Sequence, residues 1–161
     1  MTILDVPFYS QEHPVSCLPA CAWMVLSFWG RDHSENELAE VFHLHSLLGV
    51  QPEQAVIGLN SLGYQALWFE KATVDRLYEI LNHGWPAIIF LSASDLPHGR
   101  SGIHALVLVG FQDELLYCLD HALNKKKGRI TLKLNEFKYL WRRLDNQGLI
   151  IWLSSTAGNS Y

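Results

Sequence analysis

The clearest structural signal in the sequence is the apolar stretch Cys17-Leu18-Pro19-Ala20-Cys21-Ala22-Trp23-Met24-Val25-Leu26-Ser27-Phe28-Trp29-Gly30. Residues 20–29 are apolar almost all round, which is typical of a helix buried in the core, and Gly30 supplies a helix stop. Pro19 fits the first turn of such a helix, where a proline removes no intrahelical hydrogen bond. We therefore expect a buried helix with Cys17 at or just before its N-terminus.

The patterns in the rest of the chain predict an α+β domain. A capping box, Ser34-Glu35-Asn36-Glu37, indicates the start of a second helix, because the hydroxyl and the carboxylate can satisfy each other's backbone amides. Runs of apolar and β-branched residues from Tyr64 onward indicate strands. Helices are expected near 35–43, 52–62 and 74–82, strands at 64–69, 87–91, 103–111, 115–119, 129–133 and 148–153, and a short helix capped by Asn135 before the last strand. Helices dominate the first half and strands the second, so we expect helices packed on one face of a mainly antiparallel sheet.

The composition argues against a nucleic-acid-binding protein, a disulfide scaffold and a membrane-spanning protein. The 161 residues carry 12 basic and 16 acidic side chains, a net charge of −4 that argues against nucleic-acid binding. Three cysteines are too few for a disulfide scaffold and favour a reducing compartment, which we take to be the cytoplasm. Neither a secretory signal nor an apolar run long enough to span a membrane is visible. We expect one domain over residues 1–153, followed by a flexible tail over residues 154–161.

Cys17 is the candidate nucleophile. At a helix N-terminus the peptide dipoles and free amides stabilise a thiolate, which can lower the pKa of the thiol below its free value of about 8.5. A thiolate that attacks a carbonyl also needs a base to carry the proton and a third group to orient that base. Of the eight histidines only His104 lies inside a strongly apolar strand, where burial would be costly without a polar partner.

Asp120 is the candidate partner of His104. If Phe111 pairs with Leu115 across a loop of residues 112–114, positions 106 and 120 lie opposite each other. His104 and Asp120 are then diagonal neighbours on one face of the hairpin. The prediction depends on register, since a loop one residue shorter would move Asp120 to the other face.

These stretches resemble a known family. The opening residues Val6-Pro7-Phe8-Tyr9-Ser10-Gln11, followed by Cys17-Leu18-Pro19-Ala20, are similar to the start of the bacteriocin-processing, double-glycine-leader peptidases of bacteria. Residues 104–111 resemble their histidine strand, and Tyr117-Cys118-Leu119-Asp120 the strand that ends in their aspartate. The resemblance extends over roughly residues 3–153. It implies a papain-like cysteine peptidase fold, often fused to a peptide-exporting ABC transporter.

The resemblance also implies a role for each residue. Cys17 would be the nucleophile, His104 the general base and acid, and Asp120 the residue that orients His104. Gln11 would donate its side-chain amide to the oxyanion together with the backbone N–H of Cys17. The family usually has glycine where this chain has Leu18 and proline where it has His121. We expect Leu18 to crowd the cleft that selects glycine beside the cut, and His121 to leave the aspartate loop less rigid.

The resemblance implies a peptide or protein substrate, no cofactor, and a transporter acting in trans as a candidate partner. Three alternatives stay open at this stage. The chain could be an inactive peptide-binding module of the same fold, or an isopeptidase or acyl transferase that uses the same triad. A structural zinc site is a further alternative, with the four ligands Cys17, Cys21, Cys118 and His121.

Overall fold

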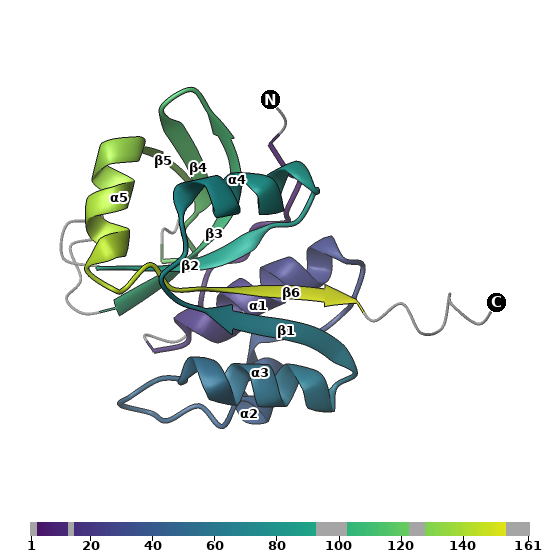
Figure 1. The fold of residues 1–161 in the computed structure, drawn as a ribbon. Helices are drawn as coiled ribbons and strands as arrows, with labels where there is room; N and C mark the ends of the chain where they lie inside the picture. The colour runs from purple at the N-terminus through teal and green to yellow at the C-terminus, as the bar shows by residue number, and fades with distance from the viewer. Residues whose placement is uncertain (1–2, 13–14, 93–102, 123–127, 154–161) are drawn as a thin grey trace.

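The centre of the fold is a six-stranded antiparallel sheet with the strand order β1-β6-β2-β3-β4-β5. The structure is a computed structural model that describes residues 3–12, 15–92, 103–122 and 128–153 (Figure 1). The tail expected over residues 154–161 lies outside this part. The elements in chain order are α1 (Cys17–Phe28), α2 (Glu35–Val41), α3 (Pro52–Ser61), β1 (Tyr64–Phe69), α4 (Val74–Asn82), β2 (Ala87–Ser92), β3 (Ile103–Gln112), β4 (Leu115–Leu119), β5 (Arg129–Lys133), α5 (Leu134–Arg142) and β6 (Gly148–Leu153).

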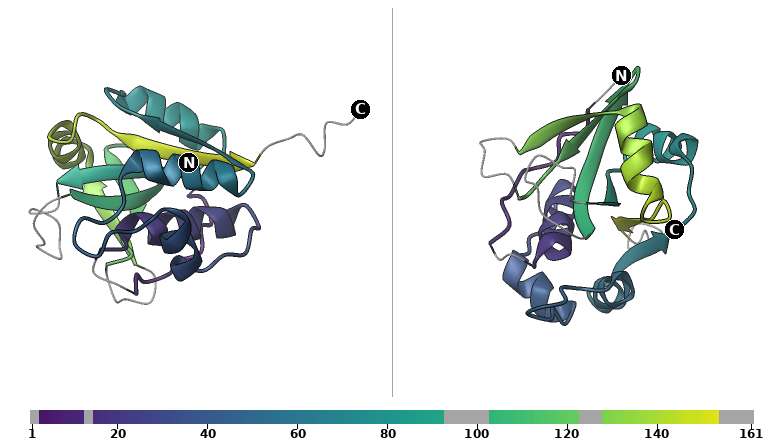
Figure 2. Two further views of the ribbon diagram at one scale, coloured as in Figure 1. Left: turned by 90° about the horizontal axis from the view of Figure 1, so that it is seen from below. Right: turned by 90° about the vertical axis from the view of Figure 1, so that its left-hand side faces the viewer.

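Helices cover both faces of the sheet, so the expectation of a single covered face was wrong. The helices α1, α2 and α3 enclose one apolar core, while α4 and α5 enclose a second core on the opposite face (Figure 2). The reason is visible in the central strands. Residues 87–91 and 104–109 are buried without alternation, so both faces of β2 and β3 must be shielded from water. The α+β class and the antiparallel sheet are confirmed.

The helix α1 begins at Cys17, as expected, and packs against β3 and β6. Pro19 lies in its first turn and is buried. The helix ends at Phe28, and Gly30 follows with a φ of 78°, a left-handed conformation that glycine adopts without steric cost. Cys17 is thus fixed by a rigid, buried helix at the edge of the core.

Two capping predictions need correction. Ser34 accepts the N–H of Glu37 at 3.0 Å, but the Glu37 carboxylate lies 2.8 Å from Nδ1 of His33, so we find no reciprocal bond that closes the box. Asn135 does not cap α5. That helix starts at Leu134, two residues earlier than expected, with Lys133 as N-cap, because β5 runs directly into it.

The hairpin of β3 and β4 also departs from the expected register. Gln112 pairs with Leu115, so the connecting turn has two residues instead of three. A β-bulge between Leu108 and Gly110 then shifts the pairing by one residue. Beyond the bulge Val107 lies opposite Leu119, which is the register that the sequence predicted. His104 and Asp120 therefore lie next to each other at the end of this hairpin.

Among the described residues, none of the helices combines the length and the apolar character needed to cross a membrane.

Candidate active site

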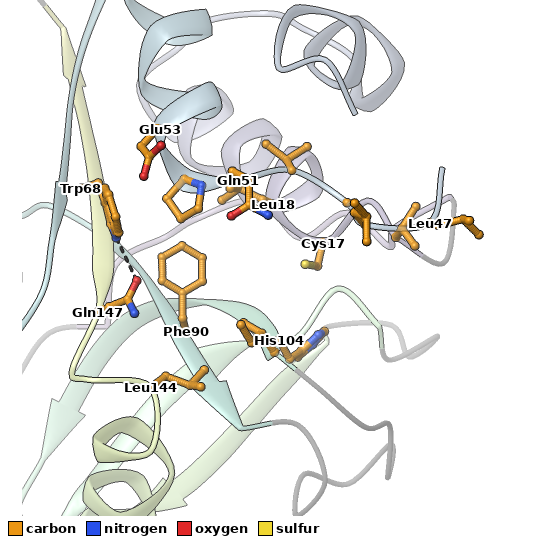
Figure 3. A pocket seen from close by; sticks show the side chains of 16 residues that line it. Cys17, Leu18, Leu47, Gln51, Glu53, Trp68, Phe90, His104, Leu144 and Gln147 are labelled. Atoms are coloured by element: carbon orange, nitrogen blue, oxygen red, sulfur yellow. Dashed lines mark hydrogen bonds between the residues drawn. The ribbon is translucent and has the colours of Figure 1, made fainter. Parts of the chain in front are cut away.

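Cys17 and His104 line the same cleft, which has a volume of about 550 Å³. Figure 3 shows Cys17 at the start of α1 on one side of this cleft and His104 from β3 on the other. The loop between α2 and α3 forms one rim, and the region between α5 and β6 lies at the far end. Among the residues that line the cleft are Leu47, Leu48, Trp68, Phe90, Leu144 and Gln147. The cleft therefore combines apolar and polar side chains, with a thiol and an imidazole at one end.

The three cysteines differ in their surroundings. Cys17 is partly exposed, whereas Cys21 and Cys118 are fully buried. Burial raises the pKa of the Cys21 thiol well above its ordinary value, and the charge of Cys17 adds to this shift. Burial likewise raises the pKa of the Cys118 thiol, with a further contribution from the Asp120 carboxylate. Only the Cys17 thiol is therefore placed to react with a molecule in the cleft.

His104 and Asp120 form a buried pair. The Nε2 atom of His104 lies 2.8 Å from Oδ1 of Asp120, and the two residues are 3% and 0% exposed. Burial by itself would raise the pKa of the Asp120 carboxyl. The hydrogen bond and charge of His104, the N–H of Ala122 and the charge of His121 outweigh burial and hold that pKa below its ordinary value. An ionised Asp120 accepts a hydrogen bond from the Nε2–H of His104, which leaves Nδ1 as the basic nitrogen of the ring.

His121, at the position where the family usually has proline, contacts residues of two other segments. Its Nε2 lies 2.7 Å from the backbone oxygen of Ala105, and its ring centroid lies 4.8 Å from that of His104. The side chain is 1% exposed. Its backbone oxygen accepts the N–H of Gln11 at 2.9 Å. His121 therefore contacts the His104 ring and the Ala105 backbone on β3, and it also binds the segment that carries Gln11.

Gln11 is held beside the Asp120–His121 segment by its backbone. Its bond to His121 places the N-terminal segment against the loop that follows Asp120. The neighbouring Glu12 N–H donates to the carboxylate of Glu35. The structure thus brings the backbone of Gln11 to the Asp120–His121 segment.

Leu18 lines the cleft directly after Cys17, as expected, but only 3% of it is exposed. Most of its side chain belongs to the core between α1 and the sheet. It therefore forms part of the cleft floor instead of standing in the cleft.

The described part of the chain does not bring the four expected zinc ligands, Cys17, Cys21, Cys118 and His121, together as one group. There, the group of residues able to share a metal ion is His104, Asp120 and His121, whose ligand atoms lie within 4.8 Å of one another. It contains none of the cysteines. One imidazole nitrogen of each histidine is already hydrogen-bonded, since His104 Nε2 lies against Asp120 Oδ1 and His121 Nε2 against the Ala105 oxygen. The arrangement fits a hydrogen-bonded dyad better than a structural metal site.

Sequence reasoning missed two features of the site. Glu35 is fully buried and accepts the hydroxyl of Ser16, the residue before Cys17, although the sequence pointed only to a helix start. Gln147 lines the far end of the cleft, where its Oε1 accepts the indole N–H of Trp68 at 3.0 Å (Figure 3). Neither residue carries a local signal, because Glu35 and Gln147 reach the site only through the tertiary fold.

Solved structures share this fold. A putative C39-like peptidase from Bacillus anthracis superimposes with a TM-score of 0.76 at 16% identity, over 96% of this chain and 98% of that chain. The double glycine motif protease of an AMS/PCAT transporter, solved with its leader peptide, gives 0.73 at 18% identity and covers 94% of each chain. The peptidase domain of Streptococcus ComA, a bifunctional ABC transporter, gives 0.72 at 17% identity, over 91% of this chain and 97% of that domain.

At these identities the likeness establishes the fold. No curated protein sequence matches the chain. The sequence profile described as the Peptidase_C39 like family matches residues 3–149, nearly the whole of the domain. This match agrees with the fold and with the resemblance seen in the sequence. The chain therefore belongs to the Peptidase_C39-like family.

Proposed function

We propose that the protein is a cysteine peptidase that hydrolyses a peptide bond through Cys17, His104 and Asp120. The observation that carries the proposal is that the thiol at the start of α1 and the imidazole bonded to Asp120 line one cleft. Family membership supports a peptidase. An inactive module would have no need for a partly exposed thiol facing a buried, oriented imidazole.

The first half of the proposed reaction forms a thioester. Nδ1 of His104 takes the proton of the Cys17 thiol, and the thiolate attacks the scissile carbonyl carbon. The carbonyl oxygen becomes an oxyanion, which the Gln11 side-chain amide and the Cys17 backbone N–H stabilise. The imidazolium of His104 then returns the proton to the leaving amine as the carbon–nitrogen bond breaks. Asp120 keeps the ring in the productive tautomer throughout.

The second half regenerates the thiol. His104 takes a proton from a water molecule, and the resulting hydroxide attacks the thioester carbonyl. The carbon–sulfur bond breaks, the carboxylic acid product leaves, and Cys17 recovers its proton from His104. An amine in place of water would give acyl transfer, and an isopeptide substrate would use the same steps.

For the substrate we propose a leader peptide that is cut after a small residue such as glycine. A structural neighbour is a double glycine motif protease solved with a leader peptide, which supports this class of substrate. Another neighbour is part of an ABC transporter, which supports a peptide-exporting transporter acting in trans as the partner. A reducing compartment such as the cytoplasm would keep Cys17 as a thiol.

A peptide library tests the proposal. Wild type, Cys17→Ala and the control Cys21→Ala are incubated with the library, and new peptide termini are identified by mass spectrometry. We expect cleavage by wild type and Cys21→Ala, loss of cleavage in Cys17→Ala, and glycine enriched before the cut. Cleavage that persists in Cys17→Ala would refute the mechanism. Peptides that bind without cleavage would support the inactive module, and products joined to an amine would support transfer.

A further inference from the structure

Glu35 is a fully buried carboxylate next to the nucleophile segment. Both of its oxygens accept the backbone N–H of Glu12, at 3.1 and 2.9 Å. Oε2 also accepts the hydroxyl of Ser16 at 2.8 Å. A carboxylate loses much solvation when it is buried and persists there only when its oxygens are hydrogen-bonded. These bonds therefore tie Glu35 to two segments that are far from it in sequence.

The two segments are the parts of the chain that would bind the oxyanion. Glu12 directly follows Gln11, and Ser16 directly precedes Cys17. One carboxylate on α2 thus holds both ends of the chain that links the two oxyanion donors. The Gln11 backbone N–H also donates to the His121 backbone oxygen, at 2.9 Å. The backbone at Gln11 is fixed between α2 and the aspartate segment.

The orientation of Ser16 adds a second argument. A serine at the N-cap of a helix normally accepts an amide of the first turn with its side chain. Ser16 is the N-cap of α1, yet its side chain makes no capping bond and donates to Glu35 instead. Glu35 therefore fixes the side chain of the residue that directly precedes Cys17, whose backbone N–H is the proposed oxyanion donor.

We propose that Glu35 is a positioning residue that sets the geometry of the oxyanion site formed by Gln11 and the Cys17 amide. The inference rests on the proposed function and extends it to a residue outside the triad. Oxyanion donors stabilise the transition state only when they lie about 2.7–3.1 Å from the developing charge. A carboxylate that fixes both donor segments would have a large effect on acyl transfer and a small one on the thiol itself.

Two probes of Cys17 separate these effects. The thiolate attacks the carbonyl of p-nitrophenyl acetate, passes through an oxyanion and expels p-nitrophenolate, whose absorbance is followed. With iodoacetamide the thiolate displaces iodide from a saturated carbon, and no oxyanion forms at that carbon. The ratio of the two rates, with Cys17→Ala as the blank, reports oxyanion stabilisation without knowledge of the peptide substrate.

We expect Glu35→Gln to lower this ratio about tenfold and Gln11→Ala to lower it by about 10²-fold. Glu35→Gln in the Gln11→Ala background should lower it little further, because Glu35 acts partly through Gln11. The control Glu40→Gln removes the same charge from an exposed position on α2 and should leave the ratio unchanged. Thermal unfolding confirms that each variant is folded. If Glu35→Gln does not fold, Ser16→Ala, which deletes the hydrogen bond from the serine hydroxyl to Glu35 Oε2, should lower the ratio severalfold.

The two rates distinguish failure of the role of Glu35 from failure of the oxyanion role of Gln11. An equal loss in both rates, or a loss in Glu35→Gln that is fully additive with Gln11→Ala, would overturn the role of Glu35. A ratio that falls in Gln11→Ala but not in Glu35→Gln or Ser16→Ala would overturn the role of Glu35 alone. A ratio unchanged even in Gln11→Ala would overturn the oxyanion role proposed for Gln11, and that of Glu35 with it.

Discussion

The imidazole of His104 meets the carboxylate of Asp120 at 2.8 Å because a β-bulge at Val109 compensates for a short turn. The register next to the turn, in which Gln112 pairs with Leu115, would if continued place Asp120 on the face opposite His104. The extra residue at the bulge restores the register before the strands reach the site. The Val109 oxygen accepts the N–H of Leu4 at 2.8 Å, so the N-terminal segment holds the bulge in place.

This pairing predicts that Asp120→Asn lowers kcat for peptide cleavage on the order of 10²-fold or more, because the neutral amide no longer selects the tautomer with a basic Nδ1. The measurement is steady-state cleavage of a peptide from the library. Asp113→Asn is a suitable control, since Asp113 lies in the turn at the other end of the same hairpin with a φ of 55°, which asparagine tolerates. Equal losses in the two variants would contradict a specific role for Asp120.

The lowered pKa of Asp120 predicts a pH-dependent contribution to stability. Above about pH 4, the ordinary carboxyl range, the folded and unfolded carboxyls are both ionised and the contribution is fully present. As the pH falls through the lower folded-state pKa, the folded carboxyl also takes up a proton and the contribution is lost. Urea unfolding at a series of pH values should therefore show that wild type and Asp120→Asn converge in free energy of unfolding below about pH 4. A difference that is constant with pH would contradict this.

Much of the fold could be predicted because its signals are local. The strands β1, β4, β5 and β6 have the predicted bounds, since each is a short apolar or β-branched run between turn residues. The turn of the β3–β4 hairpin could not be predicted, because its length depends on Asp113 adopting a positive φ. The second covered face was also missed, since it depends on where α4 and α5 pack after the chain has folded.

In the candidate site, too, residues with a local sequence signal could be predicted and residues placed by tertiary contacts could not. Cys17 and His104 stand out locally, one at the start of an apolar helix and the other within an apolar strand. Glu35 does not, because an acidic residue in the first turn of a helix is ordinarily exposed and stabilising there. Its burial arises only when the N-terminal segment folds over α2. Such tertiary contacts leave no local pattern in a single sequence.

The different burial of the three cysteines predicts selective labelling. Iodoacetamide at neutral pH should modify Cys17 in the folded protein, while Cys21 and Cys118 react only after unfolding, because both are fully buried and burial raises the pKa of both thiols. Peptide mapping by mass spectrometry identifies the modified residue over time. Labelling of Cys21 or Cys118 as fast as Cys17 would contradict the assignment of Cys17 as the accessible thiol.

Gln147 is predicted to bind the backbone of the substrate. Its Oε1 accepts the indole N–H of Trp68 (Figure 3), so its amide nitrogen is the group that can donate to a substrate in the cleft that Gln147 lines. Gln147→Glu keeps the acceptor for Trp68 but removes both N–H donors. We expect KM to rise about fivefold with kcat nearly unchanged, the effect of one neutral hydrogen bond made equally in ground and transition states. Gln65→Glu, an exposed change on the same strand as Trp68, is the control, and an unchanged KM in Gln147→Glu would refute the contact.

Gly128 is predicted to be required for the packing of the N-terminal segment against the aspartate strand. Its oxygen accepts the N–H of Asp120 at 2.7 Å, its φ is 55°, and a Cβ at this position would overlap the ring of Phe8. Gly128→Ala should therefore lower the free energy of unfolding by about 2–3 kcal/mol, the sum of backbone strain and overpacking. Gly63→Ala is the matched control, because Gly63 has a φ of 92° but open space around it, and it should lose only about 1 kcal/mol. Adding Phe8→Ala should make the Gly128→Ala loss equal to that of the control, and a loss in Gly128→Ala that Phe8→Ala leaves unchanged would show that the ring is not the obstacle.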